Sequence, residues 1–208
     1  MELPFQGGAE DALISPEAGP PLLSDFHWFI FIMKTKKTGI LGIGNLLMGD
    51  DGFGVQCVEQ FIRNYSLPEN LTVLDGGTAG IMLAPFIEEV DIIYILDAVD
   101  LQDEPGSIHR FSNDDVQSGD IQTRMSPHQV GLLEILELCK LRGKAPERVE
   151  MITVVPENLS LGIGLSPRIQ PKVNEVLDIL LDCLVSDGIV LQKKGNITEC
   201  TNSPLLRA

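Results

Sequence analysis

Two adjacent carboxylates in a glycine-rich turn are the first candidates for chemistry in this sequence. The turn reads GIGNLLMGDDG over residues 42–52 and joins a strand-like apolar run to a helix-like pattern. Glycine permits positive φ and close approach of the backbone to a ligand, and a helix N-terminus favours negative charge. Because Asp is also a preferred helix cap, we predict that Asp50 caps the helix and that Asp51 faces a cleft, although Asp51 could itself be the cap.

Two further acidic residues follow strand-like runs, since Asp75 comes after residues 71–74 and Asp97 after residues 92–96. In an open parallel α/β sheet, ligands bind beyond the carboxyl ends of the strands, where the strand order reverses. We therefore expect these acidic positions to share a cleft with Asp51. Structural alternatives remain open, namely a solvated strand end for Asp97 and ordinary Asp-Gly-Gly turn chemistry for Asp75.

His128, in the segment SPHQ at 126–129, is a histidine at a predicted element boundary. Carboxylate and imidazole groups together suit a divalent ion such as nickel, zinc or manganese. Taken alone, a capping or surface role explains this histidine at least as well. His27 and His109 have no neighbours in the sequence that indicate chemistry.

Other sites with glycine-rich or acidic motifs fit less well. The glycines of the turn read GxGxxxxG rather than the GxGxxG of dinucleotide-binding folds, and two aspartates at the helix N-terminus would repel a pyrophosphate. A P-loop would need a Gly-Lys-Ser/Thr that the turn lacks. The chain also lacks a Gly-x-Ser-x-Gly elbow, a His-Glu-x-x-His zinc helix and the Asp-Thr/Ser-Gly signatures of aspartic proteases.

Short apolar runs alternate with helical patterns from residue 36 onward, which is typical of βα units around a largely parallel sheet. Strands are predicted at 38–43, 71–74, 92–96, 106–111 and 149–155, and helices at 53–64, 79–89, 128–141 and 166–185. The last helix is expected to open at Ser166 and Pro167, a cap followed by proline at the first helical position.

The length of 208 residues suits one α/β domain. We predict an N-terminal extension at 1–33, with Met33 a plausible true start, a domain at 34–187 and a polar, loosely ordered tail at 188–208. The apolar run at 26–33 could instead add an edge strand or cover an apolar patch. It is much shorter than the roughly 20 residues that span a bilayer, so neither export nor a membrane is indicated.

A net charge of −15 argues against nucleic acid as a partner, because phosphates would be repelled. The cysteines lie too far apart for a metal knuckle or a compact disulfide framework, so we expect reduced thiols and a cytoplasmic protein. They are Cys57, Cys139, Cys183 and Cys200. We expect a monomer.

Five short motifs, in order and with sensible spacing, resemble those of the nickel-iron hydrogenase maturation endopeptidases. They lie at 42–54, 74–80, 97–98, 126–131 and 155–157, within a resemblance that covers about residues 38–185. The resemblance implies a doubly wound fold, with a twisted, mainly parallel sheet flanked by helices on both faces. Such enzymes remove a C-terminal peptide from the precursor of a hydrogenase large subunit after nickel has been inserted.

The same resemblance assigns the catalytic and metal-contacting roles to Asp51, Asp97 and His128. The nickel that they contact is supplied by the substrate, so no permanent cofactor is expected. The loop around Asp75 would position the peptide. Two other functions remain open: a non-catalytic metallochaperone or docking factor for a nickel-loaded client, and a nucleotide-binding α/β enzyme, which the glycine spacing disfavours.

Overall fold

The computed structural model describes residues 35–112, 115 and 127–195, without the side chains of 127–130. The predicted extension at 1–33 and most of the loop before the third predicted helix lie outside these residues. The chain divides into Met1–Thr35 and Lys36–Ala208, and every described helix and strand belongs to the second unit.

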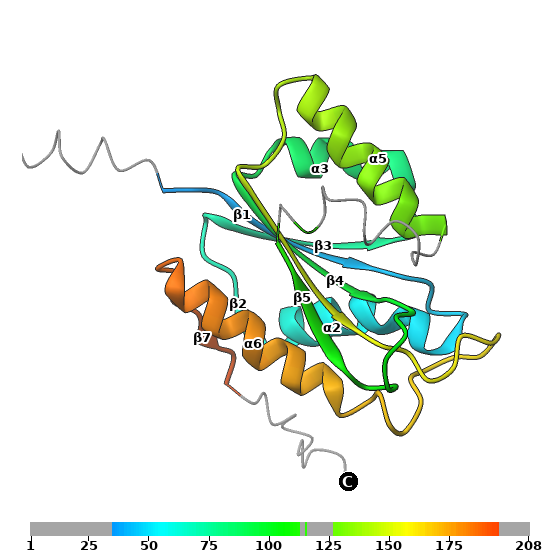
Figure 1. Cartoon of the computed structure of the whole chain (residues 1–208). Helices are drawn as coiled ribbons and strands as arrows, with labels where there is room; N and C mark the ends of the chain where they lie inside the picture. Colours follow the sequence, from blue (N-terminus) through cyan, green and yellow to red (C-terminus); the bar gives the residue numbers. More distant parts are fainter. Residues whose placement is uncertain (1–34, 113–114, 116–126, 196–208) are drawn as a thin grey trace, which may run out of the picture. The chain divides into compact units, whose positions relative to one another are not determined.

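The domain is built on a five-stranded sheet with the order β3-β1-β4-β6-β5 (Figure 1). The strands are β1 (Thr38–Ile43), β3 (Leu71–Gly77), β4 (Ile92–Ala98), β5 (Ile108–Phe111) and β6 (Arg148–Val154). The pairs between β3, β1, β4 and β6 are parallel, and β5 pairs antiparallel with β6. The predicted, mainly parallel sheet is therefore confirmed, with one antiparallel edge strand.

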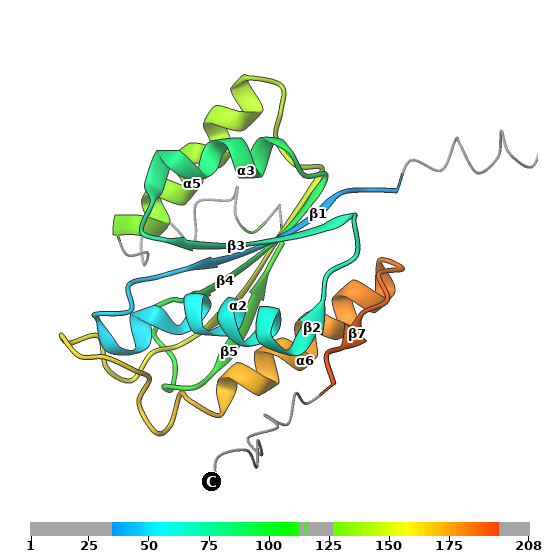
Figure 2. The ribbon, with the colours of Figure 1, turned by 180° about the vertical axis from the view of Figure 1, so that it is seen from behind.

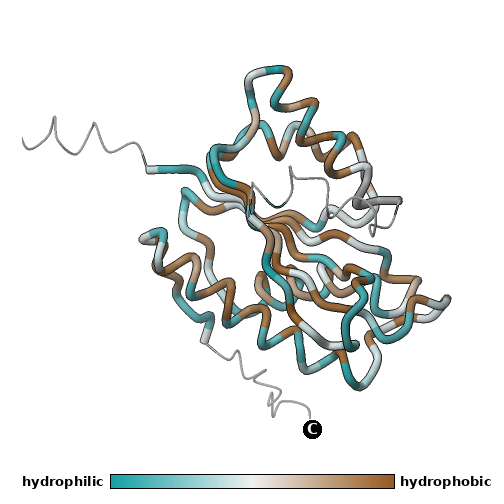
Figure 3. The backbone as a smooth tube through the Cα atoms, in the orientation of Figure 1, coloured by the Kyte–Doolittle hydropathy of each residue, from teal (hydrophilic) through white to brown (hydrophobic). Residues whose placement is uncertain are grey.

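Helices cover both faces of this sheet, as predicted (Figures 1 and 2). One face carries α2 (Phe53–Asn64) and α6 (Lys172–Ser186), and the other carries α3 (Ala84–Glu88) and α5 (Pro127–Leu141). Apolar residues are concentrated along the central strands between these layers (Figure 3). Because both faces of the central strands β1 and β4 are covered, these two strands are buried along their whole length and are mostly apolar.

Alternation along β4 decides which face each of its side chains reaches. Tyr94 and Leu96 lie in the apolar cluster with α2 and α6, whereas Ile93 and Ile95 lie in the cluster with α3 and α5. Successive side chains of a strand point to opposite faces of the sheet. Asp97 is therefore on the α5 face.

The start of the last helix differs from the prediction. Helix α6 begins at Lys172, not at Ser166. The amide of Ser166 donates to the Asp50 carboxylate, and its carbonyl accepts from Ile169 and Gln170 in a separate turn. The Ser-Pro signal is local, and this contact with a distant part of the chain overrides it.

Part of the predicted tail belongs to the domain. Ile189 is buried in the cluster with α6, and β7 (Gln192–Lys193) pairs antiparallel with β2 (Tyr65–Ser66). The prediction of a loosely ordered tail was wrong for these residues. Among the helices in the described part of the chain, none has both the length and the apolar content for a bilayer crossing.

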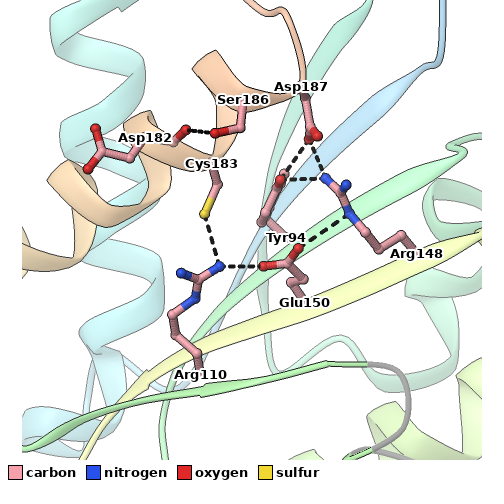
Figure 4. Close-up of a pocket in the computed structure, with 8 residues that line it drawn as sticks. All are labelled: Tyr94, Arg110, Arg148, Glu150, Asp182, Cys183, Ser186 and Asp187. Atoms are coloured by element: carbon pink, nitrogen blue, oxygen red, sulfur yellow. Dashed lines mark hydrogen bonds and ion pairs between the residues drawn. The ribbon is translucent and has the colours of Figure 1, made fainter.

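A charged network ties the C-terminal end of α6 to the sheet (Figure 4). Arg148 donates to Asp187 and, at 2.6 Å, to the Tyr94 hydroxyl, which in turn donates to Asp187 at 2.7 Å. Arg110 donates to Glu150 at 2.8 Å on the same side of the sheet. These groups line a hollow of about 200 Å³. Since Arg110 and Arg148 pair with Glu150 and Asp187, we interpret the hollow as a structural tie rather than a ligand site.

The Asp187→Asn substitution should lower the free energy of unfolding by about 1 kcal/mol at pH 7. Burial alone would raise the pKa of Asp187, but the hydrogen bonds from Arg148 and Tyr94 outweigh it and lower the pKa below its usual value. A folded-state pKa below the unfolded value stabilises the protein above about pH 4, and this contribution is lost as the pH falls through the folded pKa.

Urea unfolding at pH 7 and pH 3 measures this effect. The difference between wild type and variant should shrink at pH 3, because there the carboxyl of the unfolded chain is largely protonated and the stabilisation by the lowered pKa of Asp187 declines. Asp182→Asn, which alters an exposed carboxylate on the same helix, is the matched control and should change little. An equal loss for Asp187→Asn at both pH values would show that the carboxylate charge is not responsible.

Candidate functional site

The turn after β1 packs closely against the neighbouring strand. A Cβ atom at Gly54, in the first turn of α2, would lie 2.0 Å from the Leu96 carbonyl oxygen and 2.5 Å from that of Ile43. Only glycine allows the helix to approach the ends of both β1 and β4 this closely. The 3₁₀ turn η1 (Gly49–Gly52) that precedes α2 consequently packs against β4. This packing carries the two turn aspartates to the carboxyl end of β4.

Asp50 is an anchor for a distant loop and not a helix cap. It is fully buried, and its carboxylate accepts backbone N–H bonds from Glu157 at 3.0 Å, Asn158 at 2.8 Å and Ser166 at 2.6 Å. The N-cap of α2 is Gly52, with no side-chain cap hydrogen bond. The capping prediction was therefore wrong, because the loop after β6 offers Asp50 three donors.

Asp51 is also buried, with 8% of its surface exposed. Its Oδ2 atom accepts the backbone N–H of Asn45 at 2.9 Å, so the side chain turns back over the β1–α2 turn. This contact explains why Asp51 does not cap the helix either. It places the carboxylate beside the end of β1, where the fold predicts a ligand.

Asp97 is fully buried within β4, and its Oδ1 atom accepts the Ala98 N–H at 2.7 Å. The alternative of a solvated strand end is thus ruled out. β1 and β4 are neighbours, with Gly42 opposite Leu96. The chain passes from β1 to β3 on one side and returns to β4 on the other, so the strand order reverses between β1 and β4. Asp51 follows β1, and Asp97 lies near the carboxyl end of β4, so both are at the point where the strand order reverses, the usual ligand position in such sheets.

Asp75 does not join them in this way. It lies on β3, which β1 separates from β4, and its side chain is exposed. Its Oδ1 atom accepts the N–H of Gly77 at 3.0 Å, the ordinary turn chemistry considered as an alternative. The expectation of one cleft shared by all the strand-end acids is therefore not met at Asp75.

His128 lies in the first turn of α5, the helix that covers the face to which Asp97 belongs. Its side chain is outside the described residues. Within the described part of the chain, no three His, Cys, Asp or Glu side chains form a group that could hold a metal ion. The ligand set of Asp51, Asp97 and His128 remains a prediction.

Exposed apolar side chains lie on the loops that flank Asp51, a feature the sequence analysis missed. Leu47 is 57% exposed, Leu161 82% and Ile163 89%. Two backbone hydrogen bonds of 2.9 Å, from Gly49 to the Gly162 carbonyl and from Gly162 to the Leu47 carbonyl, join the two loops. The apolar run LGIGL in a predicted loop was the available signal. We call Leu47, Leu161 and Ile163 the apolar rim.

Comparison with known proteins agrees with the fold and the motifs. Residues 55–183 match the family model described as hydrogenase maturation protease. The hydrogenase expression/formation protein HupD of Rhizobium leguminosarum bv. viciae is 42% identical over 153 residues, which cover 73% of this chain and 76% of the relative. The hydrogenase 2 maturation protease of Escherichia coli (strain K12) is 33% identical over 151 residues, which cover 72% of this chain and 92% of the relative.

A solved structure, the hydrogenase maturating endopeptidase HybD from E. coli, superposes with a TM-score of 0.72 at 31% identity. The match covers 76% of this chain and 98% of that structure. Sequence and fold thus point to the same group of proteins. The chain belongs to the hydrogenase maturation protease family and is a peptide hydrolase.

Proposed function

We propose that this protein removes the C-terminal peptide of a nickel-iron hydrogenase large-subunit precursor after nickel insertion. The proposal depends on one observation in a chain of this family: Asp51 and Asp97 are buried where the strand order reverses between β1 and β4. In this proposal the two carboxylates and His128 contact the nickel that the substrate carries. The metal belongs to the substrate and is not a resident cofactor.

The two buried carboxylates, Asp51 and Asp97, support recognition of a cation. Buried carboxylates at the same end of neighbouring strands repel one another, and a cation bound between them would offset that repulsion. Carboxylate oxygens and an imidazole suit a borderline divalent ion such as nickel. A precursor without nickel would leave the two carboxylates unbridged and would be a poor substrate. Either the metal or a carboxylate would activate water or polarise the scissile carbonyl.

The apolar rim supports a polypeptide substrate. Its side chains stand on loops that are hydrogen-bonded to each other and anchored by Asp50, and one of these loops is the turn that leads to Asp51. Exposed apolar side chains grouped in this way are typical of protein interaction sites. The chain flanking a scissile bond would bury them.

Cleavage of a purified hydrogenase precursor, loaded with nickel or free of it, tests the proposal. We expect the nickel-loaded precursor to be shortened at its C-terminus, measured by mass spectrometry, and the nickel-free precursor to stay intact. The nickel-free precursor reconstituted with the metal is the matched control. Equal cleavage of both forms would contradict nickel recognition, and cleavage of neither would contradict the assigned substrate.

The same assay addresses a metallochaperone or docking role. A stable complex with intact, nickel-loaded precursor would indicate such a role. The family assignment favours the protease. A cytoplasmic location and a monomeric state remain predictions.

A further inference from the structure

Thr153, in the middle layer of the domain, has a buried hydroxyl without a hydrogen-bond partner. The residue is fully buried in β6, and its Oγ1 atom has no hydrogen-bond partner among the residues that the structure describes. Buried polar side-chain atoms almost always have a partner, so an unpartnered one calls for an explanation, such as a group that is bound only during function. Valine would fill the same space without this cost.

The strand register places Thr153 beside Asp97. The two residues are paired across the parallel strands β4 and β6. Met151 of β6 lies in the apolar cluster with α5, whereas Ile152 and Val154 lie in the cluster with α6. By alternation Thr153 shares the α5 face with Asp97, one strand spacing of about 4.8 Å away. The unpartnered hydroxyl of Thr153 is thus a neighbour of Asp97, close to the reversal of strand order.

The neighbour of Thr153 on its other side has a different contact. His109 of β5 is opposite Thr153 in the antiparallel pair. Its Nε2 atom lies 3.0 Å from the Asp103 carboxylate, which is an ion-pair distance without hydrogen-bond geometry. Since the imidazole faces the loop after β4, we take Asp97 as the partner of the Thr153 hydroxyl.

A carboxylate such as that of Asp97 can accept several hydrogen bonds at once. Its Oδ1 atom accepts the Ala98 N–H, while the two oxygens of a carboxylate offer about four acceptor positions in total. A hydrogen bond from Thr153 and a metal contact are therefore compatible. Groups that hydrogen-bond to a metal-contacting carboxylate fix its orientation.

We propose that Thr153 is a positioning residue, whose hydroxyl donates to the Asp97 carboxylate when the substrate engages the site. The proposal rests on the function proposed above, in which Asp97 contacts substrate-borne nickel. In the free protein the hydroxyl has no partner within the described part of the chain, and this costs stability. In the complex it holds Asp97 in the orientation that the metal needs.

Thr153→Val tests this by moving stability and activity in opposite directions. The melting temperature of the free protein should rise by about 2–4 °C, because an unpaired hydroxyl is removed from the core. Cleavage of nickel-loaded precursor should fall by about 10- to 100-fold in kcat/KM. Thr153→Ser, which keeps the hydroxyl, should restore most of the cleavage.

Two controls make the test specific. Thr38→Val changes another buried threonine of the sheet, at the opposite end of the strands, and should leave cleavage unchanged. In the Asp97→Asn background, Thr153→Val should have little further effect on residual cleavage, whereas in the His109→Gln background it should keep its full effect.

Full cleavage by Thr153→Val would overturn the proposal while leaving the function in place. A lower melting temperature would also overturn it, since the hydroxyl would then have a structural role. If Thr153→Ser is as impaired as Thr153→Val, packing rather than the hydroxyl is responsible and the proposal fails. If the wild-type protein cleaves no nickel-loaded precursor, the proposed function fails and takes this inference with it.

Discussion

Asp97→Asn is expected to reduce cleavage of nickel-loaded precursor by at least about 100-fold, within the range seen when a group acting directly in catalysis is lost. Asparagine keeps the shape of the side chain and an oxygen that can accept the Ala98 N–H. It removes the negative charge that would bind the substrate's nickel. The measurement is the rate of appearance of the shortened product at saturating precursor.

The control for this variant is Asp100→Asn, which neutralises an exposed carboxylate three positions further along the chain. It should retain wild-type cleavage. The urea midpoint of unfolding of Asp97→Asn should be equal to or higher than that of the wild type, because the substitution removes a buried charge and keeps the packed side chain. Retained activity in a folded Asp97→Asn protein would remove Asp97 from the site.

The sequence predicted the scaffold well because the governing signals are local. The apolar run at 38–43 and the amphipathic pattern at 53–64 match the bounds of β1 and α2. Asp97 was placed at the end of a strand from the run before it. The same run did not predict whether Asp97 is buried, since burial depends on which strands become neighbours.

The errors arose where long-range contacts override local preferences. Asp50 is a strong capping residue by type, yet its partners lie more than 100 positions away. The same contacts hold Ser166 outside α6. No pattern around residue 50 reveals those partners. Thr153 was missed for a related reason, because alternation within β6 is readable but its register with β4 is not.

The exposure of the apolar rim is a third feature that the sequence alone could not predict. Leu161 and Ile163 read as ordinary apolar residues in a short loop, and their sequence alone does not say whether they are buried. Their exposure follows from the backbone bonds that hold Gly162 against the β1–α2 turn. Exposure of this kind becomes visible only once the partner loop is known.

Asp50→Ala is expected to lower the free energy of unfolding by on the order of 3–4 kcal/mol, because three buried hydrogen bonds to a charged acceptor are lost together. The amides of Glu157, Asn158 and Ser166 would be left without their acceptor. Asp50→Asn should lose less, since its amide oxygen can still accept some of these bonds. Urea unfolding gives the magnitudes, and hydrogen exchange at residues 157–166 should rise in both variants.

Asp75→Ala is the matched control, because that exposed aspartate accepts a single bond from within its own turn. It should cost no more than about 1 kcal/mol. Since the Asp50 carboxylate also fixes the loop that carries Leu161 and Ile163, Asp50→Asn should raise the KM for precursor more than it lowers kcat. Equal losses of stability for Asp50→Ala and Asp75→Ala would mean that the loop holds its position without the buried charge. In that case Asp50 would return to the candidates for direct contact with the substrate.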